Sequence, residues 1–249
     1  MARPTPSLGS GLSVSRHMAF SCVALVAVAL GGCANGQYGS ELSVRPRPRS
    51  LNKVERTTLQ LPADQAFNIT LSEQSARPGL TGTADAQATV DKQGTASAVA
   101  DVRDGGAAEA GFQLGHAFTN ETDRQVDVEF RVHFDYEFAA QIAPDVGTGD
   151  GAVVLRLYAR SARRRLLRDV CLVNYTTENG ATKRKSSEQA EFTLTLAPHE
   201  SIDVYLAGQA RIEAPDTHSA DGSLKLNGVR FEVVTQPAPA VQAAPHEPR

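Results

Sequence analysis

The chain has 249 residues, of which 25 are basic and 28 are acidic, and its formal net charge at pH 7 is −3. Proteins that coat nucleic acids carry a basic excess that neutralises phosphates, so this charge balance excludes wholesale nucleic-acid binding. Three cysteines do not build a disulfide framework in a chain of this length.

The first segment, residues 1–32, has the composition of an export signal. Arg3, Arg16 and His17 precede an apolar run of 13 residues from Met18 to Leu30, and no acidic residue stands before it. A helix that crosses a bilayer needs about 20 apolar residues, so this run is too short to stay there. Small residues follow it, as a signal peptidase requires. We therefore expect residues 1–32 to be processed during export.

The four residues Leu30-Gly31-Gly32-Cys33 resemble the lipobox of bacterial lipoproteins, in which a small-residue pair precedes the cysteine that receives a diacylglyceryl group. The resemblance covers only about residues 16–34, and it implies that Cys33 is the acylated N-terminus of the mature protein. Two or three chains such as palmitate anchor a protein persistently, since each buried CH₂ contributes about 0.8 kcal/mol. The resemblance also implies an outer-membrane address in the cell envelope, because Ala34 is not the aspartate associated with inner-membrane retention. The alternative is an ordinary secretory signal with an incidental cysteine.

Residues 33–53 contain a run of alternating Arg and Pro that ends at Arg49, which predicts an extended spacer behind the lipidated N-terminus. From residue 54 onward the hydrophobic period is two, and no segment has a sustained period of 3.6 with helix caps. Strands are predicted at 67–72, 84–91, 95–102, 111–119, 126–138, 152–160, 166–175, 190–196, 202–212 and 223–234. This pattern predicts an all-β fold, an antiparallel β-sandwich of the immunoglobulin-like or jelly-roll-like kind, as a single domain over residues 54–235.

Two features precede the longest strand. Segments 84–91 and 95–102 place Ala and Val on one side, which predicts a hairpin whose small side chains let another sheet approach closely. His116 lies in "GFQLGHAF" at the parity of Phe112 and Phe118, so we expect a buried, hydrogen-bonded histidine. A catalytic or metal role would need a second ligand at a recognisable spacing, and the sequence offers none.

The longest strand, 126–138, alternates apolar residues with charged residues or His. At about 3.3 Å per residue it would be about 40 Å long, so we expect a bend or bulge along it. His133 belongs to its charged, solvated face.

The segment from Asp145 to Ala152 has the acids and glycines of a calcium loop but lacks the ligand spacing of an EF-hand, which favours a plain connection.

Positive charge is concentrated between Arg156 and Lys185, where nine basic residues stand against two acidic ones. Arg156, Tyr158 and Arg160 share one face of a predicted strand. The cluster Arg163, Arg164 and Arg165 follows it, and we interpret these six residues as a surface for an anionic partner. Lys183, Arg184 and Lys185 lie about 30 Å further along the chain by strand rise. The alternative is that both clusters only promote solubility at hairpin ends.

Cys171 lies among apolar residues in "DVCLVNY". Cys22 leaves with the signal and Cys33 is lipidated, so we expect Cys171 to have no partner in this chain and to be a small buried side chain.

After the last strand, residues 236–249 carry four prolines and predict a disordered tail.

Together these patterns predict a lipoprotein anchored in the cell envelope with a non-enzymatic binding or assembly role. Its partner would be an anionic envelope component or another envelope protein. The alternative is a glycan-binding module or an accessory subunit of a hydrolase. Sugar sites favour aromatic platforms, and a chain with no Trp and 6% aromatic residues offers only Tyr158 and Tyr205. We expect no enzyme activity, metal or cofactor, because no catalytic or metal-ligand constellation stands out.

Overall fold

The computed structural model describes residues 49–50, 57–142, 150–161, 165–176 and 182–237. The chain divides into two units, Met1–Gly32 and Cys33–Arg249, and every described residue belongs to the second. Among the described residues, no helix has the length and hydropathy needed to cross a membrane. Their regular structure consists of strands, as the two-residue period predicted.

The strands in the described ranges are β1 Arg49–Ser50, β2 Thr57–Leu61, β3 Ile69–Pro78, β4 Thr83–Val90, β5 Ala96–Arg103, β6 Gly106–Thr119, β7 Val126–Ile142, β8 Asp150–Ser161, β9 Leu166–Thr176, β10 Thr182–Leu196, β11 Ser201–Ala214 and β12 Ala220–Pro237.

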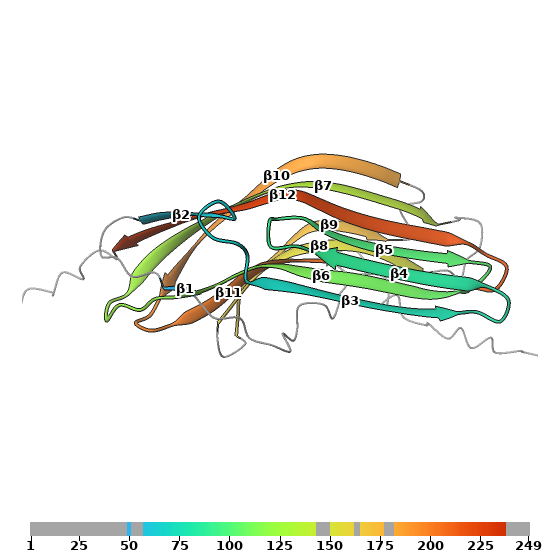
Figure 1. Ribbon diagram of the computed structural model, residues 1–249, viewed down its shortest axis with the longest axis horizontal. Helices are drawn as coiled ribbons and strands as arrows, with labels where there is room; N and C mark the ends of the chain where they lie inside the picture. Colours follow the sequence, from blue (N-terminus) through green and yellow to red (C-terminus); the bar gives the residue numbers. More distant parts are fainter. Residues whose placement is uncertain (1–48, 51–56, 143–149, 162–164, 177–181, 238–249) are drawn as a thin grey trace, which may run out of the picture. The chain divides into compact units, whose positions relative to one another are not determined.

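These strands form two sheets that pack face to face (Figure 1). Sheet A has the strand order β1-β6-β11-β8-β9, with β3 also paired to β6, and sheet B has the order β10-β7-β12-β5-β4, with β2 also paired to β12. All pairings are antiparallel except the short one between β1 and β6. The predicted antiparallel β-sandwich is confirmed.

The core lies between the two sheets and follows the alternation of the sequence. On β7 the even-numbered residues from Val126 to Ala140 are buried, whereas the odd-numbered ones are half-exposed or exposed. The alanines of β5 face inward, and Ala96, Ala98 and Ala100 are 0% exposed. Their small side chains let β5 lie against β6 and β11 of the other sheet, as the alanine pattern predicted.

Several boundaries differ from the predicted ones. Arg49 and Ser50, which the sequence placed in the spacer, pair with β6, and β12 continues to Pro237. The short strand β2 was not predicted, because "TTLQL" is only five residues long and ends before a proline. A bend or bulge was predicted along 126–138, but the register shift lies in the neighbouring strand β12, between Asn227 and Arg230, and the pairing of β7 with β10 is unbroken. Residues 143–149, in the predicted connection, lie outside the described residues.

The prediction for Cys171 was wrong. The register of β9 against β8 shifts between Leu155 and Arg156, so that Leu172 is an extra residue and the strand changes face there. Val173 is therefore buried, whereas Cys171 is exposed. It is also disulfide-bonded, and the other two cysteines of the chain, at positions 22 and 33, lie outside the described residues.

Candidate functional site

The outer face of sheet A, which points away from the core, carries most of the residues that the sequence singled out. Arg156, Tyr158 and Arg160 alternate along β8 with the core residues Leu155, Leu157 and Ala159. They therefore share this outer face. Arg165 is exposed just before β9, and residues 163 and 164 lie outside the described residues.

Four side chains on this outer face form a compact group, which we call the arginine–tyrosine cluster: Arg156, Tyr158 and Arg160 from β8, and Tyr205 from β11. The guanidinium carbons of Arg156 and Arg160 lie 5.7 Å and 5.1 Å from the centroid of the Tyr158 ring. Tyr205 is directly opposite Tyr158 on β11, and the two ring centroids are 5.4 Å apart. Both guanidinium groups are within the range of cation–π attraction, so one tyrosine ring positions two positive charges.

The two tyrosine rings are buried although they lie on the outer face. Tyr158 is 6% exposed and Tyr205 is 1% exposed. Burial raises the pKa of both phenols, mainly because the phenolate would lose its hydration, so both stay protonated at neutral pH. Neither ring offers an open face on which a sugar could stack, which weighs against the platform role that the alternative interpretation required of them.

Arg156 is held by an acid that the sequence did not single out. Its Nε donates to Oδ1 of Asp169 at 2.9 Å, and its Nη2 donates to Oδ2 at 2.7 Å. This two-pronged pair is the strongest geometry for arginine and carboxylate, and only 14% of the Arg156 side chain is exposed. The charge of Arg156 is thus balanced within the protein. The exposed residues Arg165 and Arg168 add positive charge at this end of the sheet.

A small apolar group fixes Tyr205 in the sheet. Ile69, Ala117 and Ala207 are buried with the two tyrosines on the same outer face. Gly115 is opposite Tyr205 on β6, and a side chain there would collide with the Val204 carbonyl and with Tyr205 itself. Glycine at position 115 is therefore needed to seat the tyrosine. Sequence reasoning missed this requirement because it depends on cross-strand pairing.

The two basic clusters of the sequence lie in different sheets. Arg165 and Arg168 are at the β9 edge of sheet A, whereas residues 183–185 are in β10 at the edge of sheet B. Lys183 pairs with Glu137 at 2.8 Å, and Arg184 approaches Glu188 at 3.7 Å. The second cluster is thus largely balanced by neighbouring acids.

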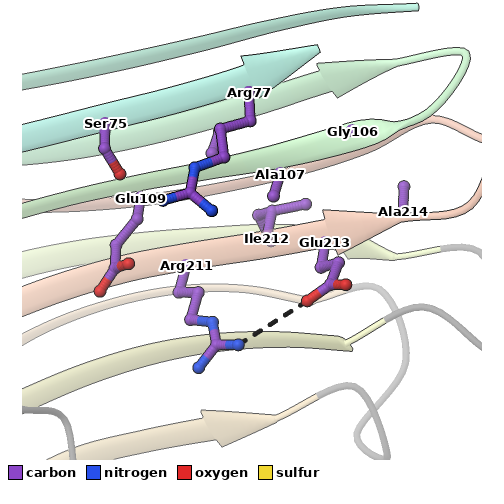
Figure 2. Close-up of a pocket in the computed structure, with 10 residues that line it drawn as sticks. Ser75, Arg77, Gly106, Ala107, Glu109, Arg211, Ile212, Glu213 and Ala214 are labelled. Carbon is purple, nitrogen blue, oxygen red and sulfur yellow. Dashed lines mark ion pairs between the residues drawn. The ribbon is translucent and has the colours of Figure 1, made fainter. Parts of the chain in front are cut away.

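A surface depression of about 480 Å³ lies at the other end of the outer face of sheet A, between β3, β6 and β11. We call it the alanine-floored depression: Ala107 forms its floor, and its rim is Ser75, Arg77, Glu109, Arg211 and Glu213. Figure 2 shows Arg77 projecting from β3, Glu109 from β6, and Arg211 with Glu213 from β11. No sequence pattern pointed to this depression, because its rim comes from three strands that are distant in the chain.

The rim groups differ in how closely they are paired. Nη2 of Arg211 lies 3.7 Å from Oε2 of Glu213, and Nε2 of Gln209 donates to Oε1 of Glu109 at 2.8 Å. Arg77 makes no side-chain ion pair or hydrogen bond within the described ranges. The depression therefore presents both donors and acceptors to solvent.

A second depression, of about 450 Å³, lies on the outer face of sheet B at the β12 bulge. His133 lines it and is half-exposed, in agreement with its predicted place on the charged face. The hydroxyl of Ser187 donates to Asp135 there and does not bond to His133.

His116 is a core residue, as predicted, with 0% exposure. Oδ1 of Asn68 accepts from the Ala117 backbone N–H at 2.9 Å, and Nδ2 of Asn68 lies 3.3 Å from Nε2 of His116. An N–H can donate only to the amide oxygen, so the amide nitrogen must face the ring and donate to Nε2. The imidazole is therefore neutral, with its proton on Nδ1.

No protein-family model matches the chain, and no curated protein matches its sequence. Among solved structures, the xylan-binding domain of Paenibacillus barcinonensis Xyn10C is similar at 14% identity, with 72% of this chain and 98% of that chain covered and a TM-score of 0.18. A family 11 carbohydrate-binding module from Clostridium thermocellum, in complex with a mixed-linked tetrasaccharide, has 8% identity, coverage of 70% and 94%, and a TM-score of 0.20.

A structure of infectious bursal disease virus, Gx strain, has 9% identity and a TM-score of 0.23, with 75% of this chain covered. The chain spans 37% of the length of that viral chain. Identities this low assign no ligand or activity to this chain.

Proposed function

We propose that this protein is a lipoprotein of the bacterial cell envelope that binds an anionic envelope component at the β8–β9 end of the outer face of sheet A. The observation that carries the proposal is the arginine–tyrosine cluster, in which one buried ring positions two guanidinium groups. Its role is binding rather than catalysis.

The chemistry of the cluster suits phosphate or carboxylate groups. Arginine recognises such anions because its planar guanidinium fork donates two parallel hydrogen bonds to them. Asp169 balances Arg156, so the exposed Arg165 supplies the attraction, together with Arg163 and Arg164, which precede it in the sequence.

Reversal of Arg163, Arg164 and Arg165 to Glu is expected to weaken binding to lipopolysaccharide or anionic vesicles at least tenfold without loss of the fold. Binding of the wild type should also fall as salt rises, since the Debye length decreases from about 10 Å at 0.1 M to about 3 Å at 1 M. Sedimentation with vesicles and with peptidoglycan measures both effects.

Reversal of Lys183, Arg184 and Lys185 is the matched control, because these residues belong to the other sheet and should matter less. Equal affinity of the wild type and the arginine variant for all three materials would refute the anionic site and leave the arginines as a solubility feature.

The proposed anchor rests on the lipobox and is tested separately. Cys33→Ala should move the protein from the membrane fraction to the soluble fraction, because the acyl chains provide the membrane affinity. Mass spectrometry of the N-terminal peptide distinguishes a lipid thioether, which resists reducing agents, from a disulfide with Cys171. Cys171→Ser is the control and should leave fractionation unchanged. Soluble wild-type protein, or a membrane-bound Cys33→Ala variant, would contradict the anchor.

A further inference from the structure

The alanine-floored depression differs in chemistry from the arginine–tyrosine cluster at the opposite end of the same sheet face. Two cations, Arg77 and Arg211, and two carboxylates, Glu109 and Glu213, stand around its floor. The four charges sum to zero, so the depression selects neither simple anions nor simple cations. It does hold strong hydrogen-bond donors and strong acceptors within one shallow space.

The pairing register separates Arg77 from Glu213 across the depression. Arg77 on β3 pairs with Ala107 on β6, which pairs with Glu213 on β11. Arg77 and Glu213 are therefore two strand spacings apart, about 9.5 Å, with only a methyl group between them. A longer side chain at position 107 would fill this gap, whereas alanine leaves a small flat floor between a donor and an acceptor.

We propose that the alanine-floored depression is a binding subsite for a polyhydroxylated ligand, a neutral glycan. Vicinal hydroxyls both donate and accept, so they match a guanidinium fork on one side and a carboxylate on the other. The C–H face of a sugar ring fits the methyl group of Ala107, and Ser75 adds a hydroxyl at the rim. The volume of about 480 Å³ is within the range of small-ligand sites, and the polar rim disfavours an apolar ligand.

This subsite is independent of the anionic site proposed above. Arg211 and Tyr205 are both on β11, six residues apart, which corresponds to about 20 Å of strand. A neutral ligand is not attracted by long-range charge, so its binding should respond little to salt. Salt dependence therefore separates the two sites in one experiment.

Isothermal titration of the mature protein with cellohexaose, maltohexaose and chitohexaose, at 0.1 M and 1 M salt, tests the inference. We expect at least one hexasaccharide to bind, with less than a twofold change in affinity between the two salt concentrations. Arg77→Gln and Glu109→Gln should each weaken that binding at least tenfold at an unchanged melting temperature. Glu73→Gln, on the same exposed face of β3 but outside the depression, is the matched control and should bind like the wild type.

Three results would overturn the inference: no binding of any of the three hexasaccharides, equal affinity of the wild type and Arg77→Gln, or binding that is lost at 1 M salt. The triple reversal of Arg163, Arg164 and Arg165 should leave hexasaccharide binding intact. A variant that loses vesicle binding but keeps sugar binding would support both sites, and the failure of one would leave the other standing.

Discussion

Asn120→Ala is expected to lower the free energy of unfolding by about 3 kcal/mol. The Asn120 side chain is fully buried, and its hydrogen bonds connect the end of β6 to the turn that follows it and to the end of β10. Its Nδ2 lies 2.8, 3.3 and 2.9 Å from the carbonyl oxygens of Arg124, Leu196 and Ala197, which share its two hydrogens. Its Oδ1 accepts from the N–H and the hydroxyl of Thr122. Removal of the amide leaves several of these groups without partners, and a buried unpaired group costs about 1–3 kcal/mol.

Thermal unfolding measures this loss, and a decrease in melting temperature of about 6–12 °C corresponds to it for a domain of this size. Asn120→Asp should be worse, because a carboxylate oxygen would then face the three carbonyls without a hydrogen atom to donate. Asn174→Ala, at an exposed asparagine of β9, is the control and should change stability by less than about 0.5 kcal/mol. Equal melting temperatures for the Asn120→Ala and Asn174→Ala variants would show that the network adds nothing.

His116→Ala is expected to lower the free energy of unfolding by about 3 kcal/mol as well. The substitution leaves a cavity beside Phe118, whose ring centroid lies 5.1 Å from that of the imidazole, and it removes the acceptor for Asn68. A double-mutant cycle with Asn68→Ala should give a coupling energy of about 0.5–3 kcal/mol. His133→Ala, on the solvent face of β7, should have little effect.

The opposite result for His116 would be informative. An unchanged melting temperature, combined with a loss of metal or ligand binding, would remove His116 from the core and make it a site residue. If the His116→Ala variant is destabilised as expected, an unchanged m-value in chemical denaturation would show that the substitution lowers stability without altering the surface exposed on unfolding.

Much of the sandwich could be predicted from local alternation. The even-numbered residues of β7, the alanines of β5 and His116 face inward, because side-chain direction in a strand changes with each residue and needs no knowledge of partners. The same rule correctly placed Arg156, Tyr158 and Arg160 on one face. The lipobox and the anchor at Cys33 also come from the sequence, and they stay predictions.

Strand pairing brought together what lies far apart in the chain. Tyr205 meets Tyr158, Asp169 balances Arg156, and Arg77 lies across Ala107 from Glu213, because β3, β6, β11, β8 and β9 are neighbours in one sheet. The apolar neighbours of Cys171 wrongly predicted its burial, because a single extra residue in β9 changes the face of the strand there. Register and bulges depend on the fit between whole strands and on the packing of both sheets, so no local pattern of residues specifies them.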